Sequence, residues 1–262
     1  MKLAVELPVS MLQELTPFTE YDFIIGSHCL LHPEYYNFYR NHRRPNTILD
    51  NGAFELGRSL SVEELGSLVH NLQPAVIVLP DVVDDRELTV AATHLFLSKH
   101  PVGISGCSYM GVLQGKSVDD YLRCLEYYAS ISDVSLIGFP YHQFNRVKFI
   151  KKYKVDEFCR EHKLKIHILG LPNPFEAVEL SLIPEIVSID TSLPVVSALH
   201  GLSMNAFQWL SSRLDIEAPA DPTTIQRTRW NIGLLRGIAA GKAHDYCILS
   251  KEDYRLHSRT GQ

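Results

Sequence analysis

Short apolar runs alternate with longer stretches of mixed polarity along this chain. Seven runs have the length and β-branched content of buried strands. They cover residues 22–27, 47–50, 75–81, 109–115, 134–140, 165–170 and 186–192. The run at 75–81 is continuously apolar up to its last residue, which is typical of parallel strands that are covered on both faces. The pattern predicts a parallel sheet.

Stretches with helical patterning follow most of these runs. Helices are predicted near Ser61, over 85–99 and 118–128, through the lysine-rich segment 148–154, from Asn173 and from Asp221. The residues before 22 suit a short strand and helix, and residues 245–249 form another candidate strand. Seven or eight strand–helix units predict an α/β fold, a closed (β/α)8 or TIM barrel, as a single domain over residues 1–262.

Composition and charge narrow the class of protein. The chain has 262 residues and 45% hydrophobic content, enough for one large core. Its formal net charge is -5 with a sequence pI near 6.2, so any contact with nucleic acid must come from local basic patches.

The cysteines and the hydropathy indicate where the protein works. Its five cysteines are odd in number and form no C-x-x-C pair, which suits reduced thiols. The amino terminus does not resemble a signal peptide, and no run approaches the roughly 18 apolar residues of a membrane span. We expect a soluble, cytoplasmic protein without a membrane partner.

Polar side chains stand where the predicted strands end. Asp50, Asp81 and Asp190 each end a strand, and Gln114 comes near the end of another. The carboxyl ends of parallel barrel strands share one mouth, and carboxylates crowded there raise each other's pKa. Such crowding suits acid–base or covalent chemistry. For Asp50 the alternatives are a cap on the helix near Ser61 or an Asx turn.

A compact basic run precedes the second strand. We expect Arg40, Arg43 and Arg44 to contact phosphates, because the run lies close to Asp50 in the sequence. The alternative is that these side chains are solvated surface, as in most such runs.

Six short motifs lie in order along the predicted strands, at 49–54, 79–81, 111–115, 136–138, 168–170 and 189–194. Together they resemble the motifs of the tRNA-guanine transglycosylase superfamily, and most closely those of its short phage and bacterial DNA 7-deazaguanine transglycosylases. The resemblance spans roughly residues 22 to 240. It implies a pentosyltransferase that exchanges guanine for a 7-deazaguanine on the same sugar, without a cofactor. In this family pattern Asp190 matches the nucleophile and Asp50 the second catalytic carboxylate.

The resemblance also implies how the base is bound. Asp81 would accept hydrogen bonds from the amino and imino edge of the purine, and Gln114 would donate to its carbonyl oxygen. The backbone amide of Gly138, with that of Gly115, would add to this contact, since a glycine permits close approach.

Two apolar side chains match positions that sandwich the base in the family. These are Phe54 and Leu169. Ordinary core packing is the alternative for both.

Two departures from the family pattern bear on the substrate. Family members that act on tRNA carry a C-x-C-x-x-C cluster followed by a histidine that binds zinc, but this chain lacks the cluster and has Trp230 at the histidine position. The basic pair expected after the nucleophile motif is replaced by Val195 and Val196. We therefore expect no metal site and no zinc-binding insertion.

The expected partners follow from these departures. They favour DNA over tRNA as the polymer, with a base such as 7-cyano-7-deazaguanine entering it, from a phage-encoded or bacterial enzyme. A second copy of the chain is a further candidate partner. A duplex would need its target nucleotide extruded, at a cost of a few kcal/mol.

Two other classes stay open. One is a barrel glycosidase or lyase acting on a small metabolite, although a Schiff-base lyase would need a strand-end lysine, which the pattern does not provide. The other is a non-catalytic barrel that binds nucleic acid.

Overall fold

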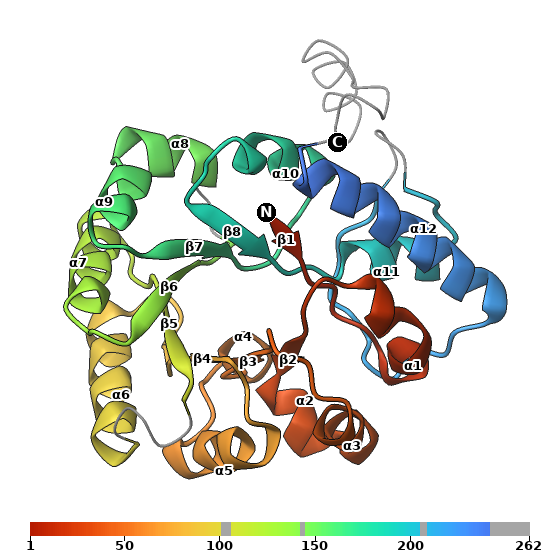
Figure 1. Ribbon diagram of the computed structural model, residues 1–262, viewed down its shortest axis with the longest axis horizontal. Helices are drawn as coiled ribbons and strands as arrows, with labels where there is room; N and C mark the ends of the chain where they lie inside the picture. Colours follow the sequence, from red (N-terminus) through yellow and green to blue (C-terminus); the bar gives the residue numbers. More distant parts are fainter. Residues whose placement is uncertain (101–105, 142–144, 205–208, 242–262) are drawn as a thin grey trace.

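The computed structural model describes residues 1–100, 106–141, 145–204 and 209–241 (Figure 1). One sheet of eight parallel strands forms its centre. The strands are β1 (Lys2–Leu3), β2 (Phe23–Ile25), β3 (Ile48–Asp50), β4 (Val76–Val78), β5 (Ser108–Val112), β6 (Val134–Phe139), β7 (Lys165–Ile168) and β8 (Ile186–Ile189). Seven of them coincide with the predicted apolar runs.

The sheet is curled, so that its two edge strands, β1 and β2, approach each other. From β2 to β8 each strand pairs with the next in the chain, and β1 pairs with β8. Across the remaining gap the Glu20 N–H donates to the Leu3 carbonyl at 3.0 Å, and the Leu3 N–H donates to Glu20 Oε2 at 2.8 Å. The segment just before β2 thus lies against β1. This all-parallel curled sheet, alternating with helices, is consistent with the predicted (β/α)8 barrel.

Helices surround the sheet (Figure 1). The α-helices are α1 (Leu12–Leu15), α2 (Gly26–Leu31), α3 (Pro33–Asn41), α4 (Ala53–Leu56), α5 (Val62–Leu72), α6 (Arg86–Lys99), α7 (Val118–Ala129), α8 (Arg146–Lys152), α9 (Val155–Glu161), α10 (Pro174–Ser181), α11 (Leu193–Leu199) and α12 (Pro222–Ala239). Two 3₁₀ turns, η1 (Val9–Met11) and η2 (Thr16–Phe18), flank α1.

Side-chain caps set the beginnings of the predicted helices. Ser61 accepts a hydrogen bond from the Glu64 N–H in a capping box at the start of α5, and Asp221 caps α12. The lysine-rich segment differs from the prediction. It divides into α8 and α9 because Lys154 has a φ of 56°, in the left-handed region.

Two apolar layers hold the sheet. The inner layer fills the curl and consists of Ala4, Tyr21, Phe23, Ile25, Ile48, Val78, Met110, Val112 and Leu136. The outer and larger layer lies between the sheet and the helices. Because successive strand residues point to opposite faces, burial on both faces explains why a run such as 75–81 is continuously apolar.

The candidate strand at 245–249 lies outside the described residues, and α12 is continuous through Gly233. Among the described residues no helix is both long and apolar enough to cross a membrane. The four cysteines in the described ranges form no disulfide.

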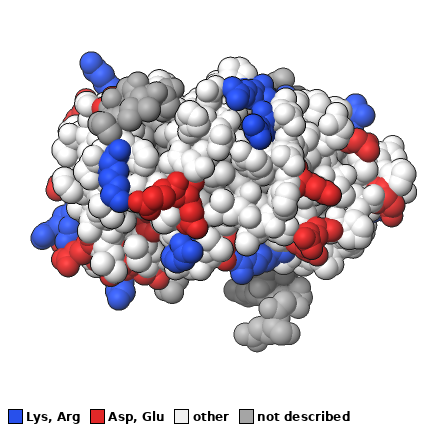
Figure 2. Space-filling view, turned by 90° about the horizontal axis from the view of Figure 1, so that it is seen from below, with Lys and Arg blue, Asp and Glu red and all other residues white. Residues whose placement is uncertain are grey.

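The surface over α2, α3 and α5 carries charges of both signs. Figure 2 shows acidic and basic side chains next to one another on this face. Mixed charge of this kind does not make the continuous basic stripe that attracts a nucleic-acid backbone.

Candidate active site at the carboxyl ends of the strands

Four polar residues predicted from the sequence lie at one rim of the sheet. Asp50 ends β3, Asp81 follows β4, Gln114 follows β5 and Asp190 follows β8. Because all strands are parallel, these positions share the mouth of the barrel. Burial, then the charge of Glu55, and then the charges of the other two aspartates raise the pKa of Asp50 well above its usual range. The structure therefore brings the predicted carboxylates together.

Asp190 is buried and held by two donors from the end of β7. The Gly170 N–H lies 3.3 Å from Oδ1 and 3.2 Å from Oδ2. The imidazole of His167 contacts Oδ1 through Nε2 at 2.9 Å. Only 3% of Asp190 is exposed, so its orientation is set by these contacts.

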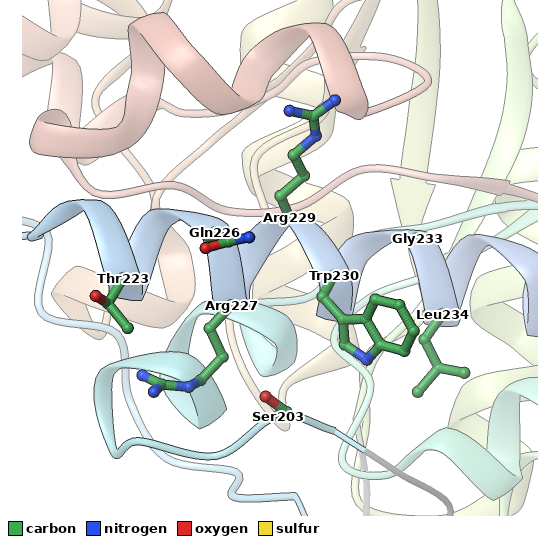
Figure 3. A pocket seen from close by; sticks show the side chains of 8 residues that line it. All are labelled: Ser203, Thr223, Gln226, Arg227, Arg229, Trp230, Gly233 and Leu234. Carbon is green, nitrogen blue, oxygen red and sulfur yellow. The ribbon is translucent and has the colours of Figure 1, made fainter.

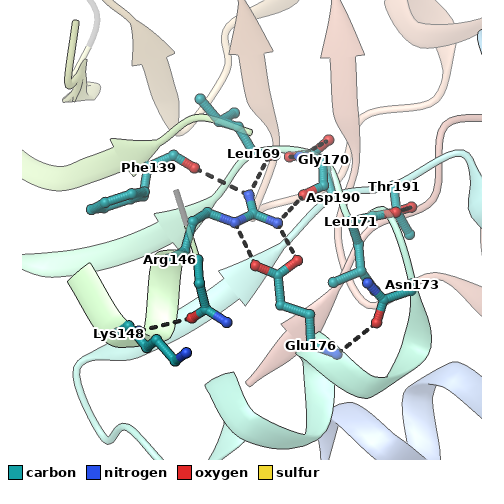
Figure 4. Close-up of polar contacts among 11 residues, drawn as sticks. Phe139, Arg146, Lys148, Leu169, Gly170, Leu171, Asn173, Glu176, Asp190 and Thr191 are labelled. Atoms are coloured by element: carbon teal, nitrogen blue, oxygen red, sulfur yellow. Dashed lines mark hydrogen bonds and ion pairs between the residues drawn. The ribbon is translucent and has the colours of Figure 1, made fainter. Parts of the chain in front are cut away.

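A buried ion pair fixes the loop that carries Gly170. The Arg146 guanidinium donates to the carbonyl oxygens of Leu169 and Gly170, each at 2.7 Å, and pairs with Glu176. Figure 4 shows these contacts beside Asp190. The ion pair thereby orients the peptide whose N–H faces Asp190.

Two side-chain amides donate hydrogen bonds to Asp81. Asn51 donates to Oδ1 at 2.6 Å, and Gln114 donates to Oδ2 at 2.5 Å. Burial raises the pKa of Asp81 to about 6, although both amide donors act in the opposite direction. The Gln114 carbonyl oxygen accepts from the Asp84 N–H at 3.1 Å, which fixes which end of the amide faces Asp81.

Asp50 stands in a tight turn. Its Oδ2 accepts a hydrogen bond from the Gly52 N–H at 2.7 Å, and Gly52 has a φ of 76°. The Asx-type contact considered for Asp50 is therefore present. The helix-capping alternative is wrong, because Ser61 caps α5. Asp50 is partly exposed toward the mouth.

Two further carboxylates were not predicted. Glu6 lies three residues beyond the end of β1, and its backbone N–H donates to the Thr191 carbonyl at 3.1 Å. Burial, then Asp190 and then Glu55 raise the pKa of Glu6 well above its usual range. Burial is also the main cause of the raised pKa of Glu55 on α4. Glu55 directly follows the motif at 49–54, whereas a two-residue strand gave no sequence signal for Glu6.

His167 and Asn51 were also missed as site residues. Each is buried and contacts a predicted aspartate. His167 was assigned to a strand as one polar residue in an apolar run. A buried polar residue needs a partner, and this requirement was the available signal.

The predicted glycines have structural explanations. A Cβ on Gly138, within β6, would lie 3.1 Å from Leu169 Cδ1, so Leu169 packs closely over it. Gly115 has a φ of 150°, and a Cβ there would lie 2.2 Å from the Asp120 Cβ at the start of α7. These contacts account for both glycines without a base, and they leave their roles in base binding as predictions.

Leu169 and Phe54 occupy different environments. Leu169 is half-buried and packs against the inner apolar layer. Phe54 is 75% exposed, with the Arg213 guanidinium 5.6 Å from its ring centroid. Arg213 also donates to the carbonyl oxygens of Phe54 and Glu55. Core packing, the alternative weighed for both, applies to Leu169 and is wrong for Phe54.

The basic run is not part of this cluster. Arg44 binds Asp22, just before β2, at 3.0 Å, and Arg43 binds Gln73, before β4. These partners precede their strands, whereas Asp50 ends β3, so both arginines lie at the opposite end of the barrel. Arg40 is exposed on α3, in the same run. The nearness of this run to Asp50 in the sequence therefore does not place it at the mouth, and phosphate binding by the run stays a prediction.

A separate hollow of about 630 Å³ lies beside α12 (Figure 3). It is lined by Ser203, Thr223, Gln226, Arg227, Arg229, Trp230, Gly233 and Leu234. Its lining contains no carboxylate, so it offers no acid–base pair. Trp230, at the position where the family has a zinc-binding histidine, is 63% exposed. Within the described ranges no group of three or more His, Cys, Asp or Glu side chains is arranged to hold a metal ion.

Comparison of the sequence with protein-family models and with curated proteins finds no match. The interpretation of the site therefore depends on the motifs and on the geometry described above.

Proposed function

We propose that this protein is a guanine transglycosylase that replaces guanine with a 7-deazaguanine in a polynucleotide, through a covalent glycosyl-enzyme intermediate. The observation that carries the proposal is that Asp50, at the end of β3, and Asp190, after β8, lie at the same mouth of the sheet. Their surroundings differ. Asp190 is held by donors, whereas Asp50 is a carboxyl with a strongly raised pKa. Two carboxyl groups with distinct roles are what a double displacement requires.

Asp190 suits the role of nucleophile. A carboxylate attacks only in its ionised form, and hydrogen-bond donors at its oxygens suit that form. In the first step an Asp190 oxygen bonds to the anomeric carbon of the sugar, and the bond from that carbon to N9 of guanine breaks. The electron pair of the broken bond goes to the departing base.

Asp50 suits the role of proton carrier. Burial and the neighbouring carboxylates raise its pKa and so favour its protonated form, which can donate a proton to the departing guanine. The resulting carboxylate then takes the proton from N9 of the incoming 7-deazaguanine, which attacks the anomeric carbon and releases Asp190. Two displacements retain the configuration of the sugar.

Asp81 and Gln114 suit recognition of the base. Guanine and 7-deazaguanine both present an amino group and a ring N–H as donors beside a carbonyl acceptor. Asp81 can accept from the donors, and the Gln114 amide has a second hydrogen to donate to the carbonyl oxygen. The contact between Asp81 and Gln114 supports their acting on one base edge.

DNA is the proposed polymer, and the support comes from the sequence. The residues that replace the zinc ligands and the basic pair, Trp230, Val195 and Val196, remove features of members that act on tRNA. The incoming base would be a 7-deazaguanine such as 7-cyano-7-deazaguanine.

The acidity of the mouth favours a second candidate. Glu6 and Glu55 join the three aspartates, and so many carboxylates do not attract a polyanion. A retaining glycosidase acting on a small neutral glycoside would use the same pair, Asp50 and Asp190.

Denaturing gels after mixing the protein with guanine-containing DNA, RNA or free guanosine separate these candidates. We expect a covalent adduct with DNA that is lost in Asp190→Ala, and base exchange slowed at least 100-fold in Asp50→Asn. Asp119→Asn, which alters an exposed carboxylate on α7, is the matched control and should keep the adduct. An adduct that survives in Asp190→Ala, or reaction with guanosine but with neither polymer, would refute the proposal.

A further inference from the structure

His167 connects β7 to the proposed nucleophile. The residue is fully buried, and the sheet register pairs it with Ser188 of β8. Its Nδ1 lies 2.8 Å from the Ser188 Oγ, and its Nε2 lies 2.9 Å from Asp190 Oδ1. Both ring nitrogens are therefore engaged by residues of the neighbouring strand and its end.

The ring is also fixed by its apolar neighbours. Phe23 stacks on it with ring centroids 5.4 Å apart and an interplanar angle of 5°. Tyr21 meets it edge-on at 6.3 Å, and the Tyr21 hydroxyl donates to the Ile189 carbonyl at 2.7 Å. A ring packed on its face and edge, with both nitrogens bonded, has a single orientation.

This arrangement specifies which nitrogen carries hydrogen toward Asp190. The Asp190 carboxylate is an acceptor, so Nε2 must donate to it. The Ser188 hydroxyl can donate to Nδ1 of the neutral ring, and it can accept from Nδ1 of the charged ring. Ser188 thus supports an Nε2–H that points at Oδ1 in either state.

The donor acts on a group whose charge changes during the proposed reaction. Asp190 loses its negative charge when it bonds to the sugar and regains it when the second displacement breaks that bond. A fixed N–H next to Oδ1 is already oriented for the returning charge and need not reorganise. It also restricts rotation of the carboxylate before the first attack.

We infer that His167 is the positioning residue of Asp190, holding it for attack and stabilising it as the leaving carboxylate. The inference rests on the proposed transglycosylation. Ser188 secures the ring, and the Gly170 N–H is the second donor to the same carboxylate. His167 is fully buried and contacts Asp190 directly, so it acts through Asp190.

Single-turnover kinetics with guanine-containing DNA test this role. His167→Leu removes the donor at similar volume, and we expect adduct formation to slow about 100-fold while KM changes less than threefold. His167→Gln keeps an amide N–H and should recover the rate to within about tenfold of wild type. The amplitude of the adduct-forming phase gives the fraction of protein molecules with an intact active site. If the rate per intact site is unchanged in His167→Leu, or if Gln is no better than Leu, the inference is wrong.

A spectroscopic measurement separates this inference from the proposed function. In protein labelled with ¹⁵N-histidine and without substrate, the Nε2–H resonance that disappears in His167→Gln should shift in Asp190→Asn. Asp119→Asn should leave it in place. An unshifted resonance refutes the positioning contact even if the enzyme exchanges bases. A shifted resonance in a protein that forms no adduct places the failure in the proposed function, and the catalytic part of the inference fails with it.

Discussion

Arg146 and Glu176 form a bidentate ion pair in the interior, with Nε to Oε1 at 2.8 Å and Nη2 to Oε2 at 2.7 Å. The side chain of Arg146 is 1% exposed and that of Glu176 is 16% exposed. The same guanidinium holds the carbonyl oxygens of Leu169 and Gly170. An ion pair between α8 and α10 thus supports the peptide that donates to Asp190.

Breaking this pair should destabilise the protein strongly. Glu176→Ala leaves the Arg146 charge buried without its carboxylate, and we expect the free energy of unfolding to fall by about 3–5 kcal/mol. Denaturant unfolding measures the change. Asp119→Ala, which breaks the exposed pair with Arg123, is the control and should cost less than about 1 kcal/mol. Equal losses in the two variants would contradict a structural role for the buried pair.

Asp81 should make stability fall as pH rises. Burial raises its pKa from the ordinary 3.8 to about 6, so between these values the unfolded chain releases a proton that the folded chain retains. Asp81→Asn cannot titrate. Its stability relative to wild type should therefore improve by about 2–3 kcal/mol from pH 4 to pH 7. A constant difference across this range, measured by denaturant unfolding, would show that the carboxyl is not perturbed.

Gly52 should be more sensitive to a side chain than Gly57. Both have positive φ, 76° and 69°, so alanine at either should cost about 1–2 kcal/mol of stability. A Cβ at Gly52 would also lie 3.0 Å from the Ser27 Cβ, whereas nothing lies within 4 Å at Gly57. Because the Gly52 N–H holds Asp50, Gly52→Ala should also slow base exchange, about tenfold. Exchange rates that fall equally in Gly57→Ala would rule out this local effect.

Arg213 should contribute more to nucleic-acid binding than Arg43. Arg213 is exposed beside Phe54 and Glu55, whereas Arg43 lies at the opposite end of the barrel. We expect Arg213→Ala to weaken binding of single-stranded DNA about fivefold and to reduce the salt slope by about one. Arg43→Ala should change affinity less than twofold in the same titrations. If Arg43→Ala weakened DNA binding more than Arg213→Ala, the binding surface would include the basic run instead.

Much of the fold was predictable because its strands are apolar on both faces. The run at 75–81 is continuous for that reason, and the helix starts at Ser61 and Asp221 carry capping side chains. Strand β1 was beyond prediction in detail, because two residues give no periodicity. Its pairing with β8 comes from closure of the sheet, which is a tertiary effect.

The site residues also fall into those that the sequence predicted and those that it did not. Asp50, Asp81 and Asp190 were predictable because each ends an apolar run, and parallel strands bring such ends together. Glu6 depends on β1, and His167 became visible only through its partners. Proximity of Arg44 to Asp50 in the sequence was misleading, because a strand separates residues at its two ends by its whole length.

The pairing of β1 with β8 brings the first and the last strand of the sheet together at the mouth. Glu6 and Asp190 lie on either side of β2 to β7 in the sequence and come together at the mouth. A ribosome would therefore release most of this polypeptide before the first strand could find its partner, and contacts so distant in sequence close slowly. A fragment that stops before β8 lacks the proposed nucleophile and leaves β1 without its paired strand, so activity at the mouth requires the complete sheet.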